Sequence, residues 1–151
     1  MEDIRNAILE FAEKSKKTKF YFNDMEKIQT AMRGIVDQST DEKKLLLLRA
    51  HPDLAGKAAL SGSLTPASKS EQSGAGLDQC SQEELAHFLQ LNDQYHSKFG
   101  FPFIMAVKGA TKEQILAGFE SRMPNDWQTE FDRAMSEVHK IAAFRLADLS
   151  L

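Results

Sequence analysis

Signals that begin α-helices recur along this chain, and they constrain its fold more than any other feature. Three pairs match the capping box, in which a hydroxyl residue and a Glu or Gln three positions later satisfy the free N–H groups of a helix start. The pairs are Ser39 with Glu42, Ser81 with Glu84, and Thr111 with Gln114. Thr65-Pro66 adds a further start, because threonine is a good N-cap and proline is tolerated at the first helical position. The chain is therefore predicted to be largely helical.

Between these signals, apolar residues recur three or four positions apart, which is the period of an amphipathic helix. The predicted helices cover residues 2–16, 23–36, 39–50, 65–74, 81–98, 111–123 and 126–149. The expected fold class is all-α, with about seven to eight helices in one compact domain over residues 1–151.

Two stretches depart from the helical pattern. Residues 51–65 are rich in Gly and Ser and are predicted to be a polar loop. Residues 100–107, Gly-Phe-Pro-Phe-Ile-Met-Ala-Val, look like a buried strand, but no other stretch is suited to pair with them. We predict an extended apolar connector in which Phe101 and Phe103 point the same way, with Pro102 and Ile104 opposite.

Composition excludes several classes of protein. A net charge of −3 gives no support for nucleic-acid binding, and no apolar run is long enough to span a membrane. The single cysteine, Cys80, excludes an internal disulfide and a Cys-based zinc site, and no two of the four histidines have the spacing of metal ligands on one helix face. A cytoplasmic location is expected by default, because the N-terminus is not a signal peptide.

His51 is the first candidate functional residue. Proline disfavours helical dihedrals in the residue before it, so Pro52 predicts that the preceding helix stops at about Ala50. The negative end of the helix dipole favours a protonated imidazole, and histidine titrates near neutral pH. His51 is therefore suited to proton transfer, although capping of the last helical carbonyls is the alternative.

Two more places break the local pattern. Ser68, Glu71 and Gln72 are spaced to share one helix face, where a hydroxyl, a carboxyl and an amide can address a polar ligand. The alternative is a face that simply meets solvent. Arg145 interrupts the apolar stripe of the last helix, where it either reaches to solvent, pairs with a carboxylate or holds a ligand anion.

Four ordered motifs together resemble the OHCU decarboxylase family. They are HPDLAGK at residues 51–57, Ser-x-x-Glu-Gln-x-x-Ala-Gly-Leu at 68–77, Leu-Asn-x-x-Tyr-x-x-Lys-Phe-Gly-Phe-Pro-Phe-Ile at 91–104, and Glu-x-x-x-Ile-Ala-x-x-Arg-Leu at 137–146. The resemblance covers about residues 24–148. It implies an all-α homodimer that needs no metal or organic cofactor. It also implies decarboxylation of 2-oxo-4-hydroxy-4-carboxy-5-ureidoimidazoline, a small ureidoimidazoline, to (S)-allantoin and CO2, the last step of urate degradation.

The resemblance also implies the site residues. His51 and Glu71 correspond to the family's catalytic residues. The residues implied to contact the substrate are Pro52, Ser68, Gln72, Phe101, Phe103, Ile104, Ala106 and Arg145. Asp53 and Lys57 are expected to shape the loop rather than to catalyse.

The chain departs from the family at its start. Residues 1–22 lack the family's Ser-Pro-Trp segment, and the only tryptophan is Trp127. Two other functions therefore stay open. One is a relative that binds ureides or purine derivatives without catalysis, and the other is a decarboxylase of a different carboxylated heterocycle.

Overall fold

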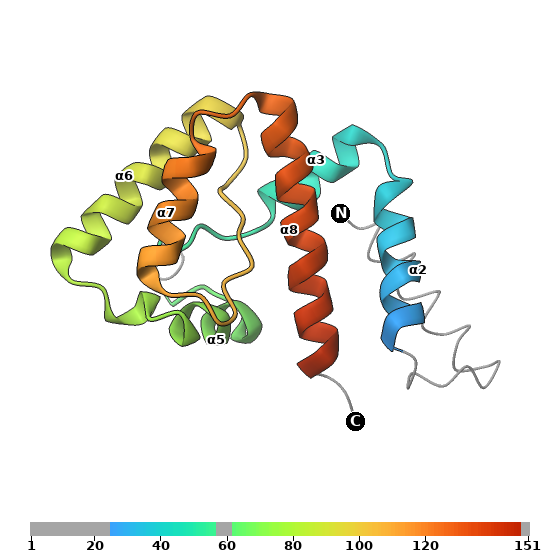
Figure 1. Ribbon diagram of the computed structural model, residues 1–151, viewed down its shortest axis with the longest axis horizontal. Coiled ribbons are helices and arrows are strands. Elements are labelled where there is room, and N and C mark those ends of the chain that lie inside the picture. The colour runs from blue at the N-terminus through green and yellow to red at the C-terminus, as the bar shows by residue number, and fades with distance from the viewer. Residues whose placement is uncertain (1–24, 57–61, 149–151) are drawn as a thin grey trace. The chain divides into compact units, whose positions relative to one another are not determined.

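The structure, a computed structural model, describes residues 25–56 and 62–148 (Figure 1). Within these ranges the regular structure is helical and contains no strand, which confirms the all-α class. The elements are α2 (Met25–Asp37), α3 (Asp41–Arg49), α5 (Pro66–Gly74), the short 3-10 helix η1 (Leu77–Gln79), α6 (Gln82–Phe99), α7 (Lys112–Arg122) and α8 (Trp127–Asp148). The described ranges thus hold six α-helices against the seven to eight expected, and the predicted helix over residues 2–16 lies outside them.

Contacts divide the chain into two compact units. Residues Leu48–Ile141 form one, here called the central unit, and Met1–Leu47 with Ala142–Leu151 form the other, the terminal unit. The central unit contains α5, η1, α6, α7 and most of α8. The described part of the terminal unit contains α2, most of α3 and the last turns of α8, with Ile28 and Val36 buried on α2.

Most predicted helix starts are confirmed. Ser81 and Glu84 form a complete capping box at the start of α6, and Thr111 and Gln114 form another at the start of α7. The Thr65 side chain caps α5 by accepting the N–H of the third helical residue. These starts were predictable because each depends on residues only three positions apart.

The predicted capping box of Ser39 with Glu42 is wrong. The hydroxyl that caps α3 belongs to Thr40, which accepts the Lys43 N–H at 3.3 Å. The Ser39 hydroxyl instead donates to the carbonyl of Ile35 at 3.0 Å, at the end of α2. Ser39 satisfies the end of the preceding helix, so the next hydroxyl residue begins α3.

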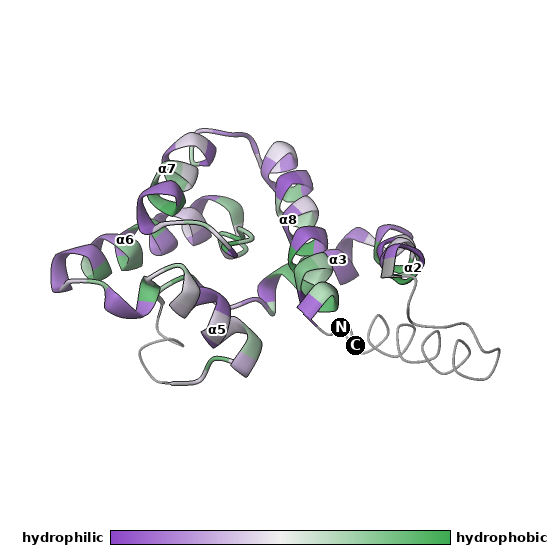
Figure 2. Ribbon diagram, turned by 60° about the horizontal axis from the view of Figure 1, so that its bottom comes forward, coloured by the Kyte–Doolittle hydropathy of each residue, from purple (hydrophilic) through white to green (hydrophobic). Residues whose placement is uncertain are grey.

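An aromatic cluster forms the core of the central unit. The ring of Tyr95, on α6, is fully buried. Its ring partners, at centroid distances of 4.5 to 6.4 Å, are Phe99, Phe101, Phe103 and Phe119. Edge-to-face pairs of this kind add to the stabilisation from burial of the rings. In Figure 2, hydrophobic and hydrophilic segments alternate along α6 and α7, as expected for helices with one face on a core.

Residues 100–107 form the predicted extended connector, which runs back beside α7 (Figure 1). Phe101 and Phe103 are both fully buried and both contact the Tyr95 ring, so they point the same way, as predicted. Phe103 also stacks on Phe119 of α7, with centroids 3.8 Å apart. The connector therefore lies in the core without pairing as a strand.

A buried ion pair joins three helices to the connector. Arg122, at the end of α7, donates through Nε to both carboxylate oxygens of Glu130 on α8 at 3.0 Å. The Tyr95 hydroxyl donates to the same carboxylate at 2.8 Å. Burial and this bond to Glu130 raise the pKa of Tyr95 above its usual range, so the phenol stays protonated. Arg122 Nη1 also donates to the Ile104 carbonyl at 2.7 Å.

Replacement of Arg122 by Met is expected to lower the free energy of unfolding by about 3 kcal/mol or more, because Glu130 is left as a buried, unpaired charge. Urea unfolding measures the change. Arg33→Met is the matched control, since Arg33 and Asp37 form an exposed pair with side chains 60% and 53% accessible. Its expected effect is about 0.5 kcal/mol or less. Equal effects of the two substitutions would contradict a structural role of the buried pair.

Candidate active site

His51 follows directly after the end of α3. That helix ends at Arg49, Ala50 lies in a turn, and the His51 N–H donates to the Leu48 carbonyl at 3.1 Å. The predicted stop at about Ala50 is confirmed. His51 and Pro52 are both half-buried. The imidazole is thus carried by a fixed turn at a helix terminus and retains access to solvent.

The start of this loop is tied to the start of the connector. Arg49 Nε donates to the carbonyl of Gly100 at 3.0 Å. The two residues are 51 positions apart in the sequence, and no local pattern pointed to the bond. The bond therefore ties the end of α3, two residues before His51, to the beginning of the connector.

Residues 53–56 form a tight turn after His51. Ala55 has a φ of +52°, in the left-handed region that side chains other than glycine rarely adopt. A Cβ on Gly56 would lie 2.5 Å from the Cβ of Asp53, so only glycine fits there. The glycine of the HPDLAGK motif is thereby explained as a requirement of loop shape.

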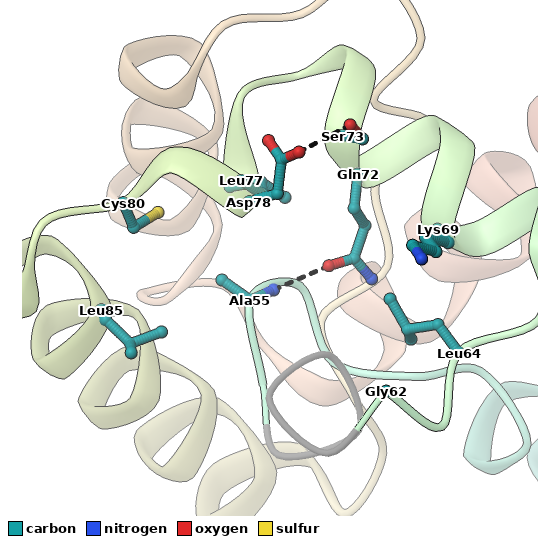
Figure 3. A pocket seen from close by; sticks show the side chains of 10 residues that line it. All are labelled: Ala55, Gly62, Leu64, Lys69, Gln72, Ser73, Leu77, Asp78, Cys80 and Leu85. Carbon is teal, nitrogen blue, oxygen red and sulfur yellow. Dashed lines mark hydrogen bonds between the residues drawn. The ribbon is translucent and has the colours of Figure 1, made fainter.

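The side chain of Gln72, on α5, clamps this turn. Its Oε1 accepts the N–H of Ala55 at 3.0 Å, and its Nε2 donates to the carbonyl of Asp53 at 3.2 Å. Figure 3 shows the amide of Gln72 against Ala55. Gln72 is only 5% exposed, and its bond to the Ala55 N–H is buried, whereas the bond to the Asp53 carbonyl is partly buried. Its amide nitrogen carries a second hydrogen, which leaves it able to donate to a ligand as well.

Helix α6 holds the same turn from another direction. Asn92 Nδ2 donates to the Leu54 carbonyl at 2.9 Å, and both residues are buried. His96 Nε2 lies 3.2 Å from Oδ1 of Asp53, a pair that is partly exposed. Asp53 thus shapes the loop, as expected, whereas the part played by His96 was not predicted. Three side chains from α5 and α6 together fix the loop that begins at His51.

The polar face of α5 is turned inward. Ser68 and Gln72 are 6% and 5% exposed, and Glu71 is half-buried. The alternative of a solvated face is therefore excluded for Ser68 and Gln72. Glu71 directly precedes Gln72, whose amide is bonded to the Asp53 carbonyl.

The remaining predicted substrate contacts lie on the connector and, in the case of Arg145, on α8. Phe101 and Phe103 are core side chains, and the Ile104 carbonyl is engaged by Arg122. The N–H of Ala106 donates to Glu137 at 3.2 Å. Arg145 is half-buried on the part of α8 that belongs to the terminal unit.

A cavity of about 430 Å³ lies beside the Gln72 clamp, a volume in the range of small-molecule sites (Figure 3). It is lined by Ala55, Gly62, Leu64, Lys69, Gln72, Ser73, Leu77, Asp78, Cys80 and Leu85. The predicted catalytic residues His51 and Glu71 are not part of this lining. Burial raises the pKa of the Cys80 thiol, which therefore is not an activated nucleophile.

Among residues 25–56 and 62–148, no three His, Cys, Asp or Glu side chains are grouped as ligands of a metal ion. No helix in the same ranges combines the length and apolar character needed to cross a membrane.

These features define a helical protein in which a clamped loop carries a histidine beside an inward polar helix face. The sequence profile of the OHCU decarboxylase family matches residues 5–147. A 2-oxo-4-hydroxy-4-carboxy-5-ureidoimidazoline decarboxylase of Haloferax volcanii is 42% identical over 127 residues, which cover 84% of this chain and 73% of that protein. The chain belongs to the OHCU decarboxylase family.

Two further relatives agree with this assignment. The uric acid degradation bifunctional protein PucL of Bacillus subtilis is 41% identical over 128 residues, which cover 85% of this chain and 25% of that longer protein. A crystal structure of OHCU decarboxylase in the presence of (S)-allantoin matches with a TM-score of 0.69 at 29% identity, covering 83% of this chain and 81% of the other.

Replacement of Gln72 by Met is expected to lower the free energy of unfolding by about 2 kcal/mol, because the Ala55 N–H and the Asp53 carbonyl lose their partner in a buried site. Denaturant unfolding measures the loss. Gln90→Met, at an exposed position of α6, is the matched control and is expected to change stability by about 0.5 kcal/mol or less. If both variants unfold at the wild-type denaturant concentration, Gln72 does not clamp the loop.

Proposed function

We propose that this protein decarboxylates 2-oxo-4-hydroxy-4-carboxy-5-ureidoimidazoline to (S)-allantoin and CO2 without a cofactor. The observation that carries the proposal is the clamped loop. It begins at the family's histidine, His51, and it is held by Gln72, the residue that follows Glu71 on α5. Membership of the OHCU decarboxylase family supports the same reaction.

His51 is proposed as the residue that exchanges a proton with the substrate. The turn after α3 and the bonds to residues 53–55 hold its backbone. A held imidazole reaches the substrate in one geometry, and a general acid or base of this kind contributes typically 10²–10⁴-fold to the rate.

Glu71 is proposed to orient the substrate hydroxyl and to decide which face of the ring carbon receives a proton. Its neighbours on the α5 face support this role. The Ser68 hydroxyl, fixed by a 3.0 Å bond from Thr65, and the second hydrogen of the Gln72 amide offer further polar contacts.

Arg145 is proposed to bind an anionic or carbonyl oxygen of the substrate through its planar guanidinium. Residues 101–106 are proposed to provide the apolar wall, together with Pro52. Because Phe101 and Phe103 are fixed in the aromatic core, they would act by holding the connector in place. Backbone groups of Ile104 and Ala106 are already bonded to charged side chains, which sets the direction of the backbone.

The reaction itself needs no external electron acceptor. The bond between the ring carbon and its carboxylate breaks, CO2 leaves, and the electron pair passes into the adjacent C=N group of the ring. That nitrogen takes up one proton. The resulting enol then transfers its hydroxyl proton to a protein group and gains a proton on the carbon that carries the ureido group. Addition to one face of that carbon gives a single enantiomer of allantoin.

The resemblance to the family extends the proposal beyond the reaction. Residues 1–151 are proposed to act as a single functional domain, in a homodimer, in the cytoplasm. Sedimentation of the purified protein at micromolar concentration tests the dimer independently of activity.

The test is to generate the unstable substrate from urate in situ and to follow its decay and the circular dichroism of the allantoin formed. The wild-type protein is expected to accelerate decay and to give (S)-allantoin in excess. His51→Asn is expected to lower kcat/KM by about 100-fold or more, since the proton-transfer group is lost. His87→Asn, at an exposed position of α6, is the control and is expected to retain activity within about twofold.

A folded wild-type protein that does not accelerate decay would contradict the proposed activity and favour the non-catalytic ureide-binding function. Normal turnover by the His51 variant would contradict the role assigned to that residue.

A further inference from the structure

We propose that Glu137 is a positioning residue for this reaction, which fixes the backbone of the connector against which the substrate binds. The inference rests on the proposed function, because it assumes that the connector lines the substrate site. Glu137 belongs to α8 within the central unit.

The carboxylate of Glu137 is buried and aimed at the connector. The residue is only 3% exposed, and its Oε1 accepts the Ala106 N–H at 3.2 Å. Ala106 lies in the extended stretch after the two core phenylalanines, where no strand pairing holds the backbone. The side chain of Glu137 thus supplies the hydrogen-bond acceptor that a partner strand would supply in a sheet.

The charge of Glu137 is balanced from the surface. Lys140 Nζ lies 2.7 Å from its Oε2, and Arg133 Nε lies 3.6 Å from the same atom. Both cationic side chains are about half exposed. The desolvation cost of a buried carboxylate offsets much of the energy gained from pairing it. The arrangement therefore fixes the position of the Ala106 backbone rather than adding net stability to the fold.

A second charged side chain holds the connector two residues earlier. Arg122 Nη1 donates to the Ile104 carbonyl at 2.7 Å, and its guanidinium carbon lies 4.3 Å from the ring centroid of Phe103. In an extended segment, backbone groups of alternate residues point to the same side. The bonds at Ile104 and Ala106 therefore turn the N–H and carbonyl of Met105 to the other side of the connector.

The backbone groups of Met105 have no hydrogen-bond partner within residues 62–148. A neighbouring N–H and C=O on one edge are complementary to the C=O and N–H of a ureido or cyclic amide group. Glu137 and Arg122 thus fix an edge that can align a ureide, and a shift of this edge would misplace the reacting carbon. A misplacement of about 1 Å costs about 100-fold in rate in well-aligned sites.

Two conservative substitutions distinguish the role of the Glu137 oxygen as a hydrogen-bond acceptor from the role of its negative charge. Glu137→Gln keeps an oxygen within reach of the Ala106 N–H but removes the charge, and it is expected to retain kcat within about threefold. Glu137→Asp keeps the charge but shortens the side chain by one methylene, so the bond to Ala106 is lost. For the Asp variant we expect kcat to fall by about tenfold or more, with a smaller change in KM and a lower excess of (S)-allantoin.

Amide hydrogen exchange provides a readout that does not depend on activity. Exchange at Ala106 is expected to stay slow in the Gln variant and to become faster in the Asp variant. Lys140→Met is the matched control, because it removes the exposed partner of Oε2 and leaves the bond at Oε1; its kcat is expected to stay within about twofold.

Two outcomes would overturn the proposal. One is an Asp variant with wild-type kcat, KM and product enantiomer, and the other is a folded Gln variant as impaired as the Asp variant, which would assign the effect to charge. Failure of the proposed function is distinguishable, since the wild-type protein itself would then be inactive while exchange at Ala106 still reports on the bond.

Discussion

The two hydrogen bonds between the Gln72 side chain and the backbone of residues 53–55 are the interaction on which the candidate site depends. They join α5 to the loop after α3 that begins at His51. The positive φ of Ala55 makes this loop strained, and the lack of room for a Cβ at Gly56 shows that it is compact. A strained loop persists only where the surrounding structure holds it, and here α5 and α6 do so.

The connector depends on charged side chains in place of a partner strand. Arg122 and Glu137 hold it at two residues on one side, and the aromatic cluster packs its phenylalanines. The ion pair of Arg122 with Glu130 in turn holds the guanidinium in place. The bond from Arg49 to Gly100 joins the end of α3, just before the loop, to the start of the connector. A rigid helical core thus presents two irregular segments in fixed positions, which is what orientation of a small substrate requires.

Local signals made much of the fold predictable, whereas the long-range bonds of the site were not. The capping boxes of α6 and α7 and the stop before His51 depend on residues within a few positions, and all are confirmed. The predicted helix start at Ser39 was wrong because Ser39 and Thr40 are both suitable N-caps, and the sequence does not show which of them caps α3. The Gln72 clamp, the bond from Arg49 to Gly100 and the pair of His96 with Asp53 join residues 17 to 51 positions apart, where no periodicity applies.

The most direct test of this account is the hydrogen-exchange rate of the Ala55 amide in the wild-type protein. Ala55 is 1% exposed, and its N–H is bonded to a buried side chain, although it lies in a loop. We expect exchange to be slowed by about 10³-fold or more relative to an unstructured amide, close to the protection of the α6 amides. Exchange at the rate of an exposed loop amide would show that the loop opens freely, and it would contradict the claim that Gln72 holds the segment carrying His51 in a fixed position.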